Sequence, residues 1–185
     1  MVAGHGSYAN LYTTPILFYF IMSEFLENLF GLKGKTAVII GGTGVLCGEM
    51  AQGLAQAGAE VVLVGRNPEK AEDRLAQIQQ VGGSGYFLSC EVGKKENLQS
   101  LLESVVERSG GVDIMVNGAG INSPTPVLDV SEDEFQNILD VNLRAVFQSC
   151  QVFGKYFLDE NRYGSIINVA PSPGSSPYPV YLLIP

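Results

Sequence analysis

The chain contains few of the residues on which hydrolytic and metal chemistry depend. Its 185 residues include no tryptophan and a single histidine, His5, which stands in an apparently irregular N-terminal stretch. Neither a Ser-His-Asp triad nor a histidine metal site is therefore expected. The three cysteines, Cys47, Cys90 and Cys150, form no Cys-x-x-Cys pair. This odd, widely spaced set argues against a disulfide framework or a zinc site, so we expect no bound metal and a reducing, cytoplasmic setting.

Positive charge and long apolar runs are also scarce. The sequence has 11 Lys and Arg residues against 19 Asp and Glu residues, a net charge of −8, with no basic cluster. Nucleic acid is therefore not an expected partner. The apolar stretch 15–22 is shorter than the roughly 20 residues that span a bilayer, and no Lys or Arg precedes Lys33, which argues against a signal peptide. We interpret residues 1–33 as an N-terminal extension and lead-in, hypothesise that translation starts at Met22, and expect no membrane partner.

One stretch of the sequence has the pattern strand, glycine turn, helix. The strand-forming run Thr36–Ile40 leads into Gly41, Gly42 and Gly44, and amphipathic helical spacing begins near Gly48. Glycine permits a tight turn and a close approach of pyrophosphate, while the free N–H groups of a helix start attract negative charge. The pattern predicts a dinucleotide phosphate site, and an ordinary glycine turn is the alternative.

A basic residue follows the next apolar run. Glu60–Val64 reads as a second strand, and it ends at Gly65 and Arg66, about 20 residues beyond the turn. A carboxylate at this position would bind the 2′-hydroxyl of NAD, whereas arginine suits the 2′-phosphate of NADP. Arg66 therefore favours NADP over NAD, unless it is only a solvated surface cation.

Strand and helix patterns alternate along the rest of the chain. Apolar runs without period-two alternation indicate strands covered on both faces, and the intervening segments have helical spacing. This order predicts an α/β fold, a Rossmann-type doubly wound parallel sheet, over residues 34–170. The further strands are expected at 86–89, 113–116 and 165–169, and the helical patterns at 71–78, 98–106 and 131–150.

One amide interrupts an apolar helix face. A capping box, Ser131 to Glu134, opens the predicted helix at 131–150, and Asn142 falls on its apolar side. A buried amide must find partners, because leaving it unpaired costs roughly 1 to 3 kcal/mol. From spacing alone, Asn142 is either a structural asparagine or part of a site.

Together these residues resemble the short-chain dehydrogenase/reductase family. The resemblance includes the glycine turn, Asn117-Gly118-Ala119-Gly120 where the family has Asn-Asn-Ala-Gly, Val141-Asn142-Leu143, and Ser165-Ile166-Ile167-Asn168-Val169. The turn departs from the family pattern Thr-Gly-x-x-x-Gly-x-Gly, since Ile40, Val45 and Cys47 occupy the threonine and later glycine positions. This variant turn is similar to that of family members that act on sugar acids.

The resemblance implies an NAD(P)-dependent oxidoreductase that transfers hydride between the nicotinamide and a small alcohol or carbonyl substrate. In the family, a tyrosine transfers the proton, a lysine four residues later lowers its pKa, a serine orients the carbonyl, and an asparagine completes a water relay. By resemblance, Asn142 is that catalytic asparagine and Glu91 lies near the adenine. The implied cofactor-binding residues are Gly41, Gly42, Thr43, Gly44, Val45, Leu46, Arg66, Glu91, Val92, Asn117, Ala119 and Gly120.

The family's proton-transfer element has no match in this sequence. No tyrosine is followed four residues later by lysine, Pro171 stands where the serine is expected, and residues 171–185 form an atypical tail with five of the nine prolines. We therefore expect a C-terminally incomplete fold, from a truncated or frameshifted reading after Ala170, and family likeness leaves a homo-oligomer open. The alternatives to an oxidoreductase are a non-catalytic dinucleotide-binding or assembly module and a nonfunctional fragment.

Overall fold

The computed structural model describes residues 24–170, which fall into two compact units that divide after Gly31. In the first unit, residues 24–30 are helical and expose their large apolar side chains. The second unit begins at Leu32 and contains the sheet and the helices that pack on it. The predicted tail 171–185 lies outside the described residues, as does most of the predicted extension 1–33.

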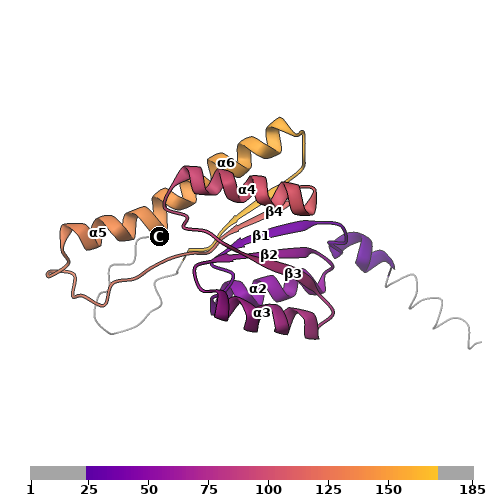
Figure 1. Cartoon of the computed structure of the whole chain (residues 1–185), viewed down its shortest axis with the longest axis horizontal. Helices are drawn as coiled ribbons and strands as arrows, with labels where there is room; N and C mark the ends of the chain where they lie inside the picture. The colour runs from indigo at the N-terminus through magenta and orange to yellow at the C-terminus, as the bar shows by residue number, and fades with distance from the viewer. Residues whose placement is uncertain (1–23, 171–185) are drawn as a thin grey trace, which may run out of the picture. The chain divides into compact units, whose positions relative to one another are not determined.

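The sheet of the second unit has five strands in the order β3-β2-β1-β4-β5 (Figure 1). All of the strand pairs are parallel, and β1 pairs in register from Thr36 with Glu60 to Ile40 with Val64. This confirms the predicted doubly wound α/β sheet. The strands are β1 (Thr36–Ile40), β2 (Glu60–Gly65), β3 (Ser84–Ser89), β4 (Ile114–Asn117) and β5 (Ser165–Asn168).

The helices cover both faces of the sheet. Figure 1 shows α2 and α3 on one face and α4 and α6 on the other. Within residues 24–170, none of the helices combines the length and the apolar character that crossing a membrane would require. The helices are α2 (Val45–Gln56), α3 (Pro68–Gln80), α4 (Lys95–Ser109), α5 (Glu132–Leu139), the π-helical turn η1 (Asp140–Arg144) and α6 (Ala145–Asp159).

Strand β1 supplies side chains to two separate apolar cores. Val38 and Ile40 point into the core that α4 and α6 cover, while Ala37 and Ile39 point into the core that α2 and α3 cover. All residues of β1 are buried, so its apolar run has no polar alternation. This is the sequence pattern expected for a central strand of a parallel sheet.

The predicted single helix over 131–150 is wrong in one respect. The structure divides it into α5 and α6, separated by the π-helical turn η1 that contains Asn142. One half of the predicted capping box is confirmed, because the Ser131 hydroxyl accepts the backbone N–H of Glu134 at 3.2 Å. The Glu134 carboxylate accepts instead from the hydroxyls of Ser123 and Thr125. A π turn keeps helical dihedrals and shifts the register by one residue, so apolar spacing alone does not reveal it.

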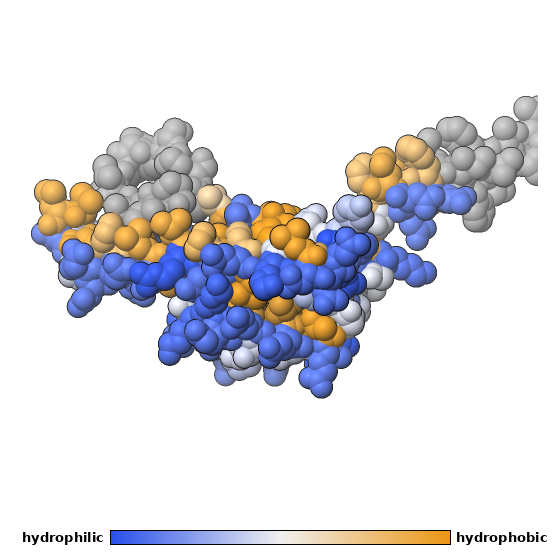
Figure 2. Space-filling view, turned by 90° about the horizontal axis from the view of Figure 1, so that it is seen from above, coloured by the Kyte–Doolittle hydropathy of each residue, from blue (hydrophilic) through white to orange (hydrophobic). Residues whose placement is uncertain are grey.

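Large apolar side chains are exposed along the helices that follow β4. Leu143 of η1 and Phe147 of α6 are 54% and 60% exposed. Figure 2 shows apolar side chains gathered on this part of the surface, next to hydrophilic ones. Such a surface is compatible with the homo-oligomer considered from the sequence, which stays a prediction.

A buried carboxylate joins the strands at the amino end of the sheet. Asp113 precedes β4, is 8% exposed, and accepts the backbone N–H of Thr36 at 3.0 Å and Lys35 Nζ at 3.1 Å. Arg162, which precedes β5, places Nη2 at 4.0 Å from the same carboxylate. The carboxylate thus links the starts of β1, β4 and β5, and it satisfies a backbone N–H that would otherwise be buried without a partner.

We predict that Asp113→Asn lowers the free energy of unfolding by about 2 kcal/mol, because a neutral amide at this buried position cannot pair with the two partly exposed cations beside it. Urea unfolding followed by circular dichroism measures this change. The control is Asp159→Asn, which removes the exposed Lys155–Asp159 ion pair on α6 and should cost less than about 0.5 kcal/mol. Equal losses in the two variants would contradict a special role for Asp113.

Candidate functional site

The glycine turn after β1 touches the backbone that follows β4. Gly41 has φ +81°, and a Cβ there would lie 2.8 Å from the carbonyl oxygen of Gly118 and 2.9 Å from the amide nitrogen of Ala119. The Gly41 N–H donates to the Val64 carbonyl at 2.8 Å. Both the positive φ and the missing side chain are therefore required here. An ordinary surface turn would need only the first of these two properties.

A cleft of about 610 Å³ opens beside this turn, at the carboxyl ends of β1, β2 and β4. This is the edge of an open α/β sheet where ligands characteristically bind, next to the point where the strand order reverses around β1. The cleft brings together seven of the residues predicted for the cofactor, namely Gly41, Thr43, Arg66, Glu91, Val92, Ala119 and Gly120.

Four predicted cofactor residues of the glycine turn lie outside this lining. Gly42 is buried under the turn, where a Cβ would meet Leu63 Cδ2 at 2.9 Å. Gly44 is the N-cap of α2 and has no side-chain cap. Val45 and Leu46, in the first turn of α2, are 81% and 61% exposed. Their backbone amides belong to the helix start, where the N–H groups have no acceptors within the helix.

Arg66 lies in the cleft immediately after β2. Within residues 24–170 it forms no ion pair with an acidic side chain. Thr43 of the glycine turn packs against the residue before Arg66, since a Cβ on Gly65 would lie 2.9 Å from Thr43 Oγ1. Arg66 is exposed and shares the cleft lining with Gly41 and Thr43 of the glycine turn, so it is available to an anion, as the NADP prediction requires.

The cleft lining also includes residues that the sequence did not indicate. Lys94 adds a second basic side chain, and Asn137, Asp140 and Val141 come from α5 and η1. Lys94 follows the loop after β3, so the rule that ligands bind at carboxyl ends of strands could have suggested it. The contribution of α5 and η1 depends on tertiary packing and has no local signal. The other lining residues are Ile40, Val64, Gly65, Cys90, Gly93, Gly118 and Ile121.

Asn117 lies beneath the cleft and not in its lining. Its side chain is 2% exposed, its Nδ2 donates to Asn168 Oδ1 at 2.8 Å, and its Oδ1 has no partner among the described residues. The amide pair joins the carboxyl ends of β4 and β5. A small cavity of about 10 Å³ borders Asn117, close to the volume that one water molecule needs.

Asn142 uses both ends of its amide on one loop residue. Its Oδ1 accepts the N–H of Ile121 at 2.9 Å, and its Nδ2 donates to the Ile121 carbonyl at 2.9 Å. A Cβ on Gly120 would lie 3.5 Å from Asn142 Oδ1. Asn142 therefore fixes the loop that lines the cleft, and the π turn places it there. Its predicted catalytic role stays a prediction.

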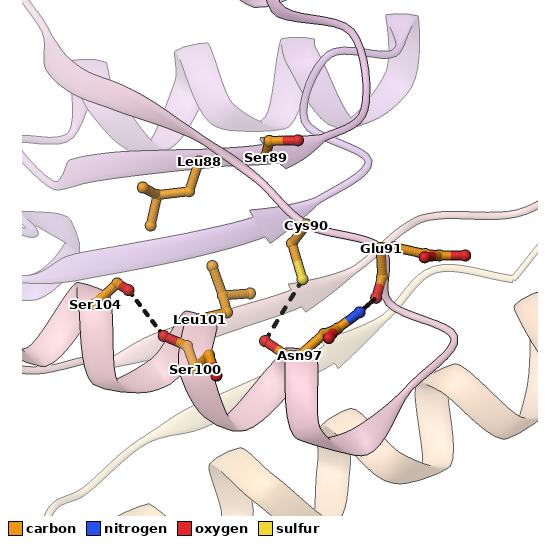
Figure 3. Close-up of a pocket in the computed structure, with 8 residues that line it drawn as sticks. All are labelled: Leu88, Ser89, Cys90, Glu91, Asn97, Ser100, Leu101 and Ser104. Atoms are coloured by element: carbon orange, nitrogen blue, oxygen red, sulfur yellow. Dashed lines mark hydrogen bonds between the residues drawn. The ribbon is translucent and has the colours of Figure 1, made fainter.

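A smaller pocket of about 330 Å³ adjoins the cleft between β3 and α4 (Figure 3). Figure 3 shows Leu88 and Leu101 facing each other across it, with the Glu91 carboxylate directed away. Asn97 of α4 donates from Nδ2 to the Glu91 carbonyl at 2.8 Å. This bond holds the loop at Glu91 and Val92. Glu91 lines both pockets, whereas Val92 lines only the larger cleft. Burial, and then the charge of Glu91, raises the pKa of the Cys90 thiol, which argues against a thiolate there.

The structure explains one departure from the family's glycine pattern. Cys47 in α2 is 4% exposed, and its thiol faces the Gly118 carbonyl with Sγ at 3.7 Å. A Cβ on Gly118 would collide with this sulfur. Burial raises the pKa of the Cys47 thiol, so it is a packing group. The glycine at position 118 therefore makes room for the cysteine at position 47.

We predict that Gly118→Ala destabilises the protein by about 1 to 3 kcal/mol, because the added methyl overpacks the contact with Cys47. In a Cys47→Ala background, where the sulfur is absent, the same change should cost at least about 1 kcal/mol less. Urea unfolding of the two single variants and the double variant measures this coupling. Additive effects would contradict the proposed exchange of volume.

Comparison with known proteins agrees with this geometry. The family model described as short chain dehydrogenase matches residues 35–183. An uncharacterized oxidoreductase, UxuB of Bacillus subtilis, is 34% identical over 161 residues, which cover 79% of this chain and 58% of that protein. The 2-dehydro-3-deoxy-D-gluconate 5-dehydrogenase of Escherichia coli is 33% identical over 143 residues, covering 77% of this chain and 56% of that protein. The chain thus spans a little over half the length of these relatives.

A solved structure shows the same fold with a bound nucleotide. It is a metagenomic short-chain oxidoreductase in complex with NADP, with a TM-score of 0.71 and 27% identity. The match covers 80% of this chain and 67% of that one.

Proposed function

The chain belongs to the short-chain dehydrogenase/reductase family, and from this membership we propose that it binds NADP(H) in the cleft beside the glycine turn. The observation that carries the proposal is that Gly41 and Thr43 of the glycine turn line the cleft, and that the same turn leads into the start of α2, whose N-cap Gly44 provides no side-chain cap. In this proposal the first amides of α2 bind the pyrophosphate, and Arg66 binds the 2′-phosphate.

The remaining cofactor contacts follow from the cleft. The Glu91-Val92 loop, held by Asn97, would contain the adenine, and Ala119 and Gly120 would lie along the nucleotide. Asn142 would keep this last loop in place through Ile121. When bound, the cofactor supplies a nicotinamide that can give or accept hydride.

For the whole protein we propose oxidoreduction of a small alcohol or carbonyl compound. The similarity to 2-dehydro-3-deoxy-D-gluconate 5-dehydrogenase favours a sugar acid as the substrate. A cytoplasmic location is proposed from the cysteine pattern.

A second candidate is a dinucleotide-binding module without turnover. It is favoured by a specific observation: no tyrosine in the sequence is followed four residues later by lysine. A phenol with an unperturbed pKa of about 10 is a poor base at neutral pH. Both candidates require the same cleft, and only substrate-dependent oxidation of NADPH separates them.

We predict that the chain binds NADPH more tightly than NADH, and that Arg66→Ala weakens NADPH binding about tenfold or more by removing a charge-assisted contact to the 2′-phosphate. NADH binding should change little, because NADH has no such phosphate. Titration followed by the fluorescence of the reduced nicotinamide measures both affinities.

The matched control is Arg108→Ala, since Arg108 lies on α4 over the Tyr86 ring and outside the cleft. This variant should bind both nucleotides as the unmodified chain does. Binding of neither nucleotide by a chain that is folded by circular dichroism would refute the cofactor proposal. Equal weakening of NADPH and NADH in Arg66→Ala would refute the role given to Arg66.

A further inference from the structure

Arg74 of α3 lies across the first turn of the neighbouring helix α2. Its Nη1 donates to Glu49 Oε1 at 2.8 Å, and its Nη2 donates to the Gly44 carbonyl at 3.4 Å. The Arg74 side chain is 13% exposed, whereas that of Glu49 is 64% exposed. An ion pair at the surface does not require the arginine to be buried this far. The contact with the turn is therefore the distinctive feature of this side chain.

The sequence of α2 leaves space for this guanidinium. Gly48 is buried on the face of α2 that meets α3, and a Cβ there would collide with Nε and Cζ of Arg74. Glycine weakens a helix interior relative to alanine. A glycine at this position is accounted for by the arginine that occupies the space of its missing side chain.

The peptide that Arg74 contacts is also the one that begins α2. Gly44 is the N-cap, its side chain offers no cap, and its carbonyl accepts the Gly48 N–H at 3.0 Å. The amides of the following turn have no acceptors within the helix, and such amides bind phosphate. Arg74 therefore acts on the group that sets the direction of these amides, although it does not line the cleft.

We propose that Arg74 is a positioning residue for pyrophosphate: by holding the Gly44 carbonyl it keeps the start of α2 in the conformation that binds the dinucleotide. This inference deepens the proposed function and rests on it. It assigns Arg74 to the pyrophosphate, which NADPH and NADH share, and Arg66 to the 2′-phosphate, which only NADPH has.

The first test needs no cofactor. Cys47 is buried in the first turn of α2, so its alkylation reports local opening of that turn. We expect Arg74→Ala to raise the alkylation rate of Cys47 about three- to tenfold, with Cys150 as the reference thiol in the same peptide mass spectra. Lys70→Ala is the matched control, since it removes an equal charge from α3, and it should leave the rate unchanged.

Gly48→Ala gives an independent route to the same state. The added methyl displaces the guanidinium while it improves the helix propensity of α2. We expect faster alkylation of Cys47 with no loss of global stability, and no further increase in the Arg74→Ala, Gly48→Ala double variant. If Arg74 did not hold the turn, the added methyl would only stabilise α2, and alkylation of Cys47 would become slower.

The second test separates the phosphates of the cofactor. Arg74→Ala should weaken the binding of NADPH and of NADH by the same factor, about three- to tenfold. The affinity for adenosine 2′-monophosphate should stay unchanged, because that probe has no pyrophosphate. Arg74→Lys keeps the charge but has one nitrogen in place of the planar fork that reaches Glu49 and Gly44 together. Its affinity for both dinucleotides should fall between those of Arg74→Ala and the unmodified chain.

The outcomes distinguish this inference from the proposed function. The positioning role is overturned if Arg74→Ala leaves the alkylation rate of Cys47 unchanged, or if it raises that rate but leaves the dinucleotide affinity unchanged. In either case, NADPH binding by the unmodified chain still supports the proposed function. An unmodified chain that binds neither dinucleotide overturns the proposed function and the pyrophosphate role with it, and Cys47 alkylation then still decides whether Arg74 holds the turn.

Discussion

The contact between the glycine turn and the backbone after β4 determines how the rest of the sheet can be built. Gly41 can approach Gly118 and Ala119 only because β1 and β4 are parallel neighbours that end at the same level, with Ile40 paired to Asn117. The pairing is extended beyond the strands by the Gly118 N–H, which donates to the Ile40 carbonyl at 3.0 Å. Helix α2 begins at Val45, directly after the turn, and its small buried residues allow it to pack closely on the sheet. The cleft lies beside this contact, and Gly41, Gly118 and Ala119 are among the residues that line it.

Next to this contact, a side chain of α2 fills the space that a side chain in the loop after β4 would otherwise occupy. A cysteine at position 47 looks like a damaged glycine motif when α2 is considered alone, and a glycine at position 118 looks like a loss when the loop is considered alone. In the structure the sulfur of the first residue fills the space left by the second. Protein interiors are packed densely enough that such a pair must be judged together. A departure from a sequence motif is therefore not by itself evidence of a defective site.

The sequence predicted the strands well and the cleft only in part, for physical reasons. Buried parallel strands have continuous apolar runs, which is why Thr36–Ile40 was predicted with its observed ends. The start of β3 was missed because Ser84 and Gly85 have no apolar signal. The π turn at Asp140–Arg144 was missed because both flanking helices keep a continuous apolar face. Lining residues such as Asn137 depend on packing between distant elements, which no local pattern encodes.

The cleft and the segment that follows β5 belong to different parts of this sequence. Every residue that lines the cleft lies between Ile40 and Val141, on elements that pack into one sheet and its covering helices. The position where family likeness places the serine that orients the carbonyl, at Pro171, follows β5 and lies outside the described residues. The amide of Asn142, the one catalytic residue that the likeness identifies, is already bonded at both ends to Ile121. Its oxygen and nitrogen therefore act on the loop that lines the cleft, and this structural role does not depend on turnover.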